Sequence, residues 1–136
     1  MPTIVVGYVP KPEGDAALDR AVDEARLRGA RLIVVNSQRG GKTADYEDLA
    51  FTDEQVKSVE ARLEGAGVEH EVRGLVRGND PAEDVVAVAE EFGADLIVIG
   101  LRKRTPVGKL IMGSNAQRIL LDAACPVLAV KASQQG

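Results

Sequence analysis

The chain has 136 residues, 45% of them hydrophobic and 28% charged, which is the size and composition expected of a single globular domain over residues 1–136. Its net charge of −4 and aromatic content of 3% argue against a nucleic-acid-binding protein, because phosphate backbones are held by clustered lysine and arginine and bases by aromatic side chains. No apolar run reaches the roughly 18 residues that span a bilayer, the first residues do not resemble a signal peptide, and the single cysteine makes no internal disulfide, so we expect a cytoplasmic protein without a membrane segment.

Strand and helix patterns alternate in the first part of the chain. The apolar run of residues 3–9 predicts a strand that is ended by prolines. Residues 14–28 carry apolar side chains at helical spacing with charged residues opposite them, which predicts an amphipathic helix packed on a sheet. The continuous apolar run of residues 31–35 predicts a strand covered on both faces. The polar residues 36–50 predict a loop or a short irregular helix.

The same alternation continues through the middle of the chain. Residues 52–65 begin with a capping box, Thr52 to Gln55, and predict a second helix. Residues 68–73 alternate apolar and charged side chains, as an edge strand with one wet face does. Residues 80–92 predict a third helix, because Asp80 is a good N-cap and a proline follows it. The apolar run of residues 95–99 predicts the next strand.

A glycine-containing loop, a helix and a last strand, residues 124–130, complete the pattern. Gly113 and Ser114 directly precede an amphipathic segment, and Ser114 with Gln117 matches a capping box, so we expect Ser114 to be the N-cap. The unpaired N–H groups and the positive dipole end of this helix would then face the end of a strand. Such a position favours an anion.

This order of elements predicts an α/β domain. A mostly parallel, doubly wound five-stranded sheet with helices on both faces and right-handed crossovers satisfies it. In such sheets, ligands bind beyond the carboxyl ends of the strands, where the strand order reverses. We expect residues 133–136 to form a short flexible tail.

The spacing of residues 100–114 resembles the nucleotide-binding signature of the universal stress proteins. That signature has a glycine, two residues, a glycine, nine residues, a glycine and then serine or threonine. Gly100 takes the first place, Lys103 stands where the second glycine is expected, and Gly113 with Ser114 closes the motif. The resemblance extends in register over nearly the whole chain. It implies the strand order 3-2-1-4-5 and a crevice in which the turn after Val9 faces the Gly100 loop.

The resemblance also implies a ligand, namely ATP or another adenine nucleotide, with or without Mg²⁺. The site residues that it implies are Val9, Gly100, Arg102, Lys103, Gly113, Ser114 and Asn115. Val9 replaces an aspartate that contacts the ribose or adenine end of the nucleotide in ATP-binding members. Without that acceptor, a buried hydroxyl or amine of the nucleotide stays unpaired. This costs about 1–3 kcal/mol of binding free energy, roughly a ten- to hundredfold loss of affinity. Lys103 restricts backbone approach to phosphate but supplies a point charge.

Four cations lie within eight residues of the loop after Gly100: Arg102, Lys103, Arg104 and Lys109. In an acidic protein, such a cluster beside a helix N-terminus favours a basic lip over a phosphate or another anion. The alternative is a solvated loop whose charges serve solubility.

Catalytic residues find little support in the sequence. The single histidine, His70, lies between two glutamates in a predicted strand, and Cys125 precedes a strand expected to be buried. We therefore expect neither a metal site nor a redox cofactor, and a binding protein rather than an enzyme. Slow ATP hydrolysis is disfavoured, because the sequence has no evident general base or magnesium-binding set.

The last strand suggests a partner. Residues 126–131 would lie at the sheet edge, and an apolar edge strand pairs readily with another chain. The resemblance implies a homodimer through this strand, whereas the alternative is an edge shielded by the C-terminal tail. We therefore expect a universal stress protein that acts in stress response by binding a nucleotide, or alternatively a homodimeric protein-interaction module that has lost nucleotide binding.

Overall fold

The computed structural model describes residues 1–38, 53–76, 81–101 and 113–132, and strands alternate with helices throughout these residues. The strands are β1 (Thr3–Gly7), β2 (Arg31–Gln38), β3 (His70–Val76), β4 (Leu96–Leu101) and β5 (Val127–Lys131). The helices are α1 (Pro12–Arg28), α3 (Asp53–Gly65), α4 (Pro81–Phe92) and α5 (Ser114–Asp122). None of these described helices is long and apolar enough to cross a membrane.

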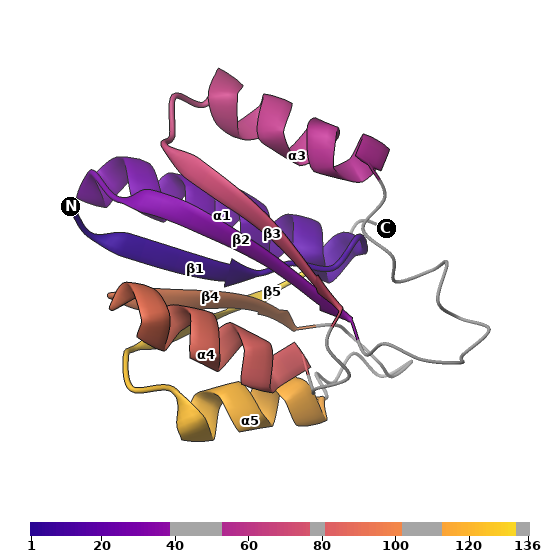
Figure 1. Cartoon of the computed structure of the whole chain (residues 1–136), viewed down its shortest axis with the longest axis vertical. Coiled ribbons are helices and arrows are strands. Elements are labelled where there is room, and N and C mark those ends of the chain that lie inside the picture. The colour runs from indigo at the N-terminus through magenta and orange to yellow at the C-terminus, as the bar shows by residue number, and fades with distance from the viewer. Residues whose placement is uncertain (39–52, 77–80, 102–112, 133–136) are drawn as a thin grey trace.

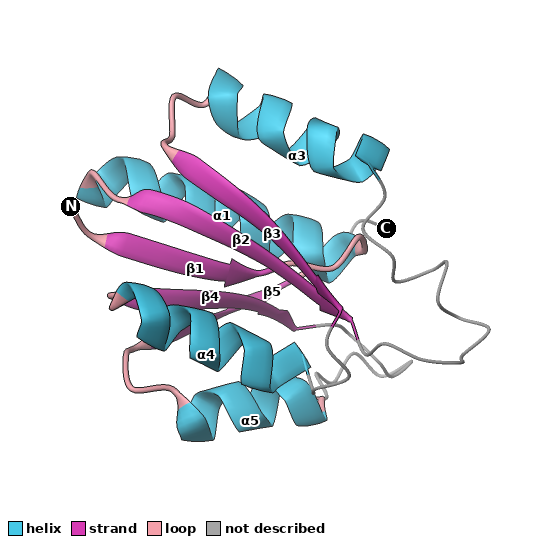
Figure 2. Cartoon of the chain, in the orientation of Figure 1, coloured by secondary structure: helices cyan, strands magenta, loops and turns pink. Residues whose placement is uncertain are grey.

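The five strands form one parallel sheet in the order β3-β2-β1-β4-β5. Helices α1 and α3 cover one face of it, and α4 and α5 cover the other (Figure 1). The arrows in Figure 2 show that the carboxyl ends of the strands lie at one common edge of the sheet. The predicted α/β, doubly wound fold is confirmed, and its strand order reverses between β1 and β4, as expected.

The continuous apolar runs of the strands contribute side chains to two hydrophobic cores, one on each face of the sheet. In β1, Ile4 and Val6 pack toward α1 and α3, whereas Val5 packs toward α4 and α5, and all three are fully buried. In β2, Leu32 and Ile33 alternate in the same way. Because side chains alternate between faces along a strand, a central strand with a helix layer on each side needs an apolar residue at every position.

The ends of several elements differ from the predicted ones. The first helix begins at Pro12 rather than near residue 14, because proline has no N–H and suits the first turn, where N–H groups have no helical partner. The first strand ends at Gly7, so residues 8–9 belong to the turn that leads into α1. The predicted N-caps Thr52 and Asp80 and the predicted tail of residues 133–136 lie outside the described residues.

The prediction of a loop from residue 36 was wrong at its start, because β2 continues to Gln38. Asn36 is 2% exposed, and its Nδ2 donates a hydrogen bond to the Tyr8 carbonyl oxygen at 2.9 Å. A polar side chain is therefore accommodated inside the sheet, where it holds the backbone that follows β1. Residues 39–50 of the predicted loop lie outside the described part of the chain.

Candidate functional site

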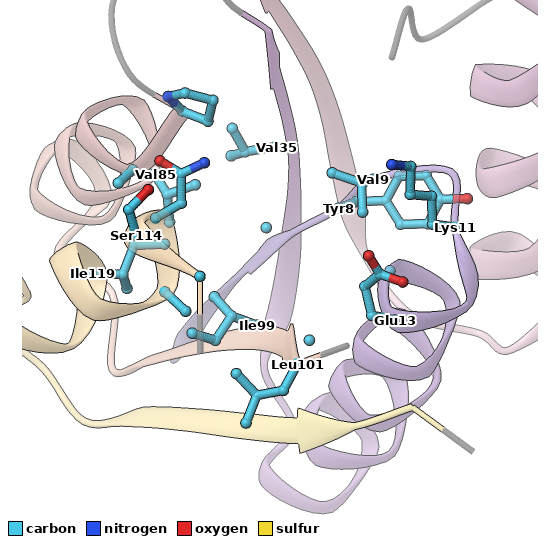
Figure 3. A pocket seen from close by; sticks show the side chains of 18 residues that line it. Tyr8, Val9, Lys11, Glu13, Val35, Val85, Ile99, Leu101, Ser114 and Ile119 are labelled. Atoms are coloured by element: carbon cyan, nitrogen blue, oxygen red, sulfur yellow. The ribbon is translucent and has the colours of Figure 1, made fainter. Parts of the chain in front are cut away.

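A cavity of about 410 Å³ opens at the carboxyl ends of β1 and β4, where the strand order reverses (Figure 3). Its walls come from the turn between β1 and α1 and from the first residues of α4 and α5. Five of the predicted site residues line it, namely Val9, Gly100, Gly113, Ser114 and Asn115. Arg102 and Lys103, together with the rest of the predicted basic lip, lie outside the described residues.

On the α1 side of the cavity, two glycines allow backbone segments to touch. A Cβ atom added at Gly14 would lie 2.8 Å from the Val9 backbone nitrogen and carbonyl carbon. A Cβ atom added at Gly100 would lie 2.7 Å from the carbonyl carbon of Glu13. Both distances are too short for a real side chain, and the obstacles are backbone atoms that cannot rotate away. Gly100 therefore has a packing role that its place in a nucleotide-binding motif did not indicate.

Two hydrogen bonds of Tyr8 hold the turn between β1 and α1 in place. The Tyr8 backbone N–H donates to the Val35 carbonyl oxygen at 2.8 Å, and the Tyr8 hydroxyl donates to the Asp15 carboxylate at 3.1 Å. Burial, with a smaller contribution from the Asp15 charge, raises the pKa of Tyr8 from 10.0 to about 12. The only sequence signal for this pair was the seven-residue spacing of a tyrosine and an aspartate, which is too common to interpret.

On the α5 side, the predicted capping box is wrong by one residue. The N-cap is Gly113, with extended backbone angles (φ −71°, ψ 166°), and its carbonyl oxygen accepts the Gln117 N–H at 3.1 Å. Ser114 is thus the first helical residue, and its side chain is exposed at the cavity. Both glycine and serine are good N-caps, so the sequence alone did not distinguish Gly113 from Ser114 as the N-cap. The correction leaves the Ser114 hydroxyl without a capping role.

Gly113 differs from Gly100 in its surroundings. Its φ is ordinary for any residue, and a Cβ atom added there would meet no described atom within 4 Å. The first N–H groups of α5 have no partner within the helix, and residues 114–116, which carry them, line the cavity. Space and hydrogen-bond donors therefore coincide at this end of the cavity.

Charged side chains are sparse among the described residues that line the cavity: Lys11 is the cation and Glu13 is the carboxylate. The rest of the described wall is mainly apolar and includes Val35, Val85 and Ile99 (Figure 3). Within the described ranges, no group of three histidine, cysteine, aspartate or glutamate side chains could hold a metal ion. The described cavity wall is thus mainly apolar, with the N-terminus of α5 on one side and the charged side chains of Lys11 and Glu13 on the other.

The two other residues considered for chemistry lie away from this cavity. His70 begins β3, at the opposite end of the sheet, and its Nδ1 lies 2.8 Å from the Val68 carbonyl oxygen. Cys125 lies just before β5, where it borders a second cavity of about 270 Å³ between the ends of α4 and α5. Burial raises the pKa of its thiol, which disfavours the thiolate form.

Comparisons with known proteins agree with the fold. The model of the universal stress protein family matches residues 1–131. A universal stress protein of Mycolicibacterium smegmatis is 44% identical over 129 residues, which cover 94% of this chain and 96% of that protein. A solved structure of a universal stress protein from Archaeoglobus fulgidus is 39% identical, with a TM-score of 0.78 over 96% of this chain and 98% of that chain.

A second Archaeoglobus fulgidus structure is that of the universal stress protein in complex with dAMP. It is 33% identical to this chain, with a TM-score of 0.72 over 96% of this chain and 98% of that chain. The resemblance noted in the sequence is confirmed by the match over residues 1–131 and by the identity to full-length relatives. This chain belongs to the universal stress protein family.

Proposed function

We propose that this protein acts in stress response by binding an adenine nucleotide, ATP or a smaller relative of it, in the cavity between β1 and β4. The observation that carries the proposal is that one cavity combines the open N-terminus of α5 with apolar walls at the point where the strand order reverses. The dAMP complex of the Archaeoglobus fulgidus protein supports the choice of an adenine nucleotide.

The phosphate end of the nucleotide belongs at Gly113 and Ser114. The first N–H groups of α5 and its dipole favour negative charge there, and the exposed Ser114 hydroxyl supplies one more donor. Asn115, which also lines the cavity, follows in the same helical turn. Arg102 and Lys103 precede this turn in the sequence, and we propose that they add positive charge.

The adenine end belongs against the aliphatic walls of the cavity. Val35, Val85 and Ile99 come from β2, α4 and β4 and line the cavity on the side away from Glu13 (Figure 3). A flat, largely apolar ring loses contact with water when it lies between such side chains. The cavity therefore supplies a donor-rich end for phosphate and an apolar space for the base.

Binding without turnover is part of the proposal. Hydrolysis of ATP needs a group that orients or deprotonates the attacking water within hydrogen-bond distance of it. The described lining of the cavity holds one carboxylate, Glu13, on the α1 side and away from Ser114 (Figure 3). Mg²⁺, where present, would arrive with the nucleotide.

Isothermal titration of the nucleotide-stripped protein with ATP, AMP and cyclic AMP, with and without Mg²⁺, tests the proposal. We expect micromolar binding of at least one nucleotide. Ser114→Ala should weaken it about tenfold, because a hydroxyl–phosphate hydrogen bond contributes roughly 1.4 kcal/mol. Ser58→Ala, an exposed site on α3 away from the cavity, is the matched control and should leave binding unchanged. A folded protein that releases no heat with any nucleotide up to millimolar concentration would contradict the proposal.

Val9 favours a second candidate function. Its side chain offers no hydrogen-bond acceptor at the rim of the cavity, as expected of a family member that no longer binds nucleotide and acts through protein contacts. Absence of nucleotide binding in the titration above, from a folded dimer, would place this interaction-module function first.

We also propose that the protein is a homodimer through residues 126–131. β5 is an edge strand, and the Ile97 N–H donates to the Pro126 carbonyl oxygen while the Ala132 N–H donates to Leu101. Even-numbered residues of β5 therefore bond to β4, and the N–H of Ala129 points to the open edge. Light scattering after size exclusion should give a dimer, and Ala129→Pro, which removes that N–H, should give a folded monomer. A monomeric parent protein would contradict the dimer.

A further inference from the structure

The α1 side of the cavity holds a carboxylate that has no partner among the described residues. Glu13 lies in the first turn of α1, is half-buried and lines the cavity. No ion pair or hydrogen bond joins its carboxylate to another described residue. It is also the one acidic side chain in the described cavity wall. Its oxygens are therefore available to a ligand.

Two backbone contacts hold Glu13 in place. Gly14 lets the first turn of α1 close onto the Val9 backbone, and Gly100 lets β4 touch the Glu13 carbonyl group. The backbone of Glu13 is thus packed between the ends of β1 and β4. The fixed backbone places the start of this side chain at a defined point of the cavity wall, so a ligand that contacts it has only the side-chain torsions to order.

Glu13 and Ser114 lie on opposite sides of the cavity (Figure 3). In Figure 3 the Glu13 carboxylate lies with Val9 and Lys11 on the α1 side, and Ser114 lies on the other side of the cavity. A ribose between the two carries neighbouring 2′ and 3′ hydroxyl groups. One carboxylate can accept hydrogen bonds from both, because each of its oxygens has free lone pairs.

We propose that Glu13 recognises the ribose hydroxyl groups of the bound nucleotide and thereby selects ribonucleotides over nucleotides without these hydroxyls. The inference rests on the proposed nucleotide binding. The direction of the ligand follows from the proposed phosphate position at Gly113 and Ser114, which leaves the sugar for the α1 side, where Glu13 lies beside Lys11 (Figure 3). Glu13 is thus a specificity residue that compensates for the apolar side chain of Val9.

A structural role would be the simpler explanation for this glutamate. A carboxylate in the first turn of a helix interacts favourably with the helix dipole, whether or not a ligand binds. That role predicts an equal effect of a substitution on every ligand. Recognition of the hydroxyl groups predicts an effect only on ligands that carry them.

Titration of the parent protein and Glu13→Ala with AMP and with 2′,3′-dideoxyadenosine 5′-monophosphate separates these roles. We expect the parent protein to prefer AMP by about ten- to hundredfold, the strength of hydrogen bonds to a charged acceptor. Glu13→Ala should lose this preference, with AMP weakened and the dideoxy analogue changed less than threefold. Asp23→Ala removes the same charge from an exposed position of α1 and should retain the preference of the parent protein.

The outcomes distinguish this inference from the function on which it rests. AMP binding with an unchanged preference in Glu13→Ala would overturn the role of Glu13 and leave nucleotide binding standing. No binding of either nucleotide by the folded parent protein would overturn both. Should Glu13→Ala fail to fold, Glu13→Gln keeps the size of the side chain but offers one acceptor oxygen and no charge. It should reduce the preference at least threefold, and an unchanged preference would overturn the inference.

Discussion

The two sides of the cavity use glycine for different reasons. On the α1 side, Gly14 and Gly100 are required by the fold, because a Cβ atom at either position would collide with backbone. On the α5 side, Gly113 has ordinary backbone angles and an open surrounding, so nothing in the described structure forbids a side chain there. One side is therefore closely packed backbone, and the other is a helix N-terminus that is open as far as the described residues show.

This difference changes how the glycine motif is interpreted. Gly100 and Gly113 are two parts of one sequence signature, but only Gly113 lies where a missing side chain can benefit a ligand alone. If Glu13 binds the ligand as proposed, Gly100 would act on binding through the position of Glu13, whose carbonyl group it contacts. Substitutions at the two glycines should thus separate stability from binding.

The largest expected effect is on the α1 side. Gly100→Ala places a methyl group against the Glu13 carbonyl, so β4 or α1 must move. We expect a loss of about 3 kcal/mol in the free energy of unfolding, measured by urea denaturation, because the obstacle is backbone and cannot repack. A loss below 1 kcal/mol would show that this side is as adaptable as the α5 side.

A smaller effect on stability is expected from Tyr8, which lies in the turn between β1 and α1. The pKa of Tyr8 is about 12 in the folded protein and about 10 when unfolded, so its contribution to stability is complete below pH 10 and is lost as the pH rises through 12. Relative to pH 8, this group should cost the protein roughly 1.4 kcal/mol of unfolding free energy at pH 11.

Tyr8→Phe tests that contribution, because phenylalanine does not titrate. Urea denaturation of both proteins at pH 8 and pH 11 should show a smaller alkaline loss for the variant, by the amount above. All other titrating groups are common to the two proteins and cancel in the comparison. Equal alkaline losses would mean that Tyr8 is not held in its neutral form by the fold.

The smallest effect on stability is expected on the α5 side. Gly113→Ser should change the free energy of unfolding by less than about 0.5 kcal/mol, since serine is a good N-cap and the added side chain meets no described atom. The same variant should weaken nucleotide binding, because its side chain occupies the approach to the first N–H groups of α5. Paired urea denaturation and titration measure both, and destabilisation as large as that of Gly100→Ala would remove the contrast between the two sides.

The fold was largely predictable because its signals are local. The apolar runs of β1, β2 and β4 and the helical spacing of α1 follow from residues close together in the sequence. The strand order came from the family resemblance alone, since alternating strands and helices are compatible with several orders. The N-cap of α5 is Gly113, and it was predicted one residue too late, at Ser114, because both residues suit an N-cap.

The structure of the site depends on contacts that no local pattern shows. Gly100 meets Glu13, and Asn36 supports Tyr8, across long separations in the sequence. Glu13 was not among the predicted site residues, because an acidic residue in a first helical turn is common. The strand order places the segment after β1 next to the segment after β4. Glu13 could have been predicted as a site residue from this order, had we considered that the first turn of α1 faces the same crevice.

The cavity walls come from segments at opposite ends of the chain: the turn after β1 contributes one wall, and the start of α5 contributes the other. A chain in which either segment has detached has no such cavity, so a ligand of this site binds the complete fold only. Ligand present at 100 times its dissociation constant would then add about 2.7 kcal/mol to the stability of the folded state. In a cell, the abundance of the nucleotide would set how long the protein survives proteolysis, so the protein's own lifetime would report the nucleotide supply.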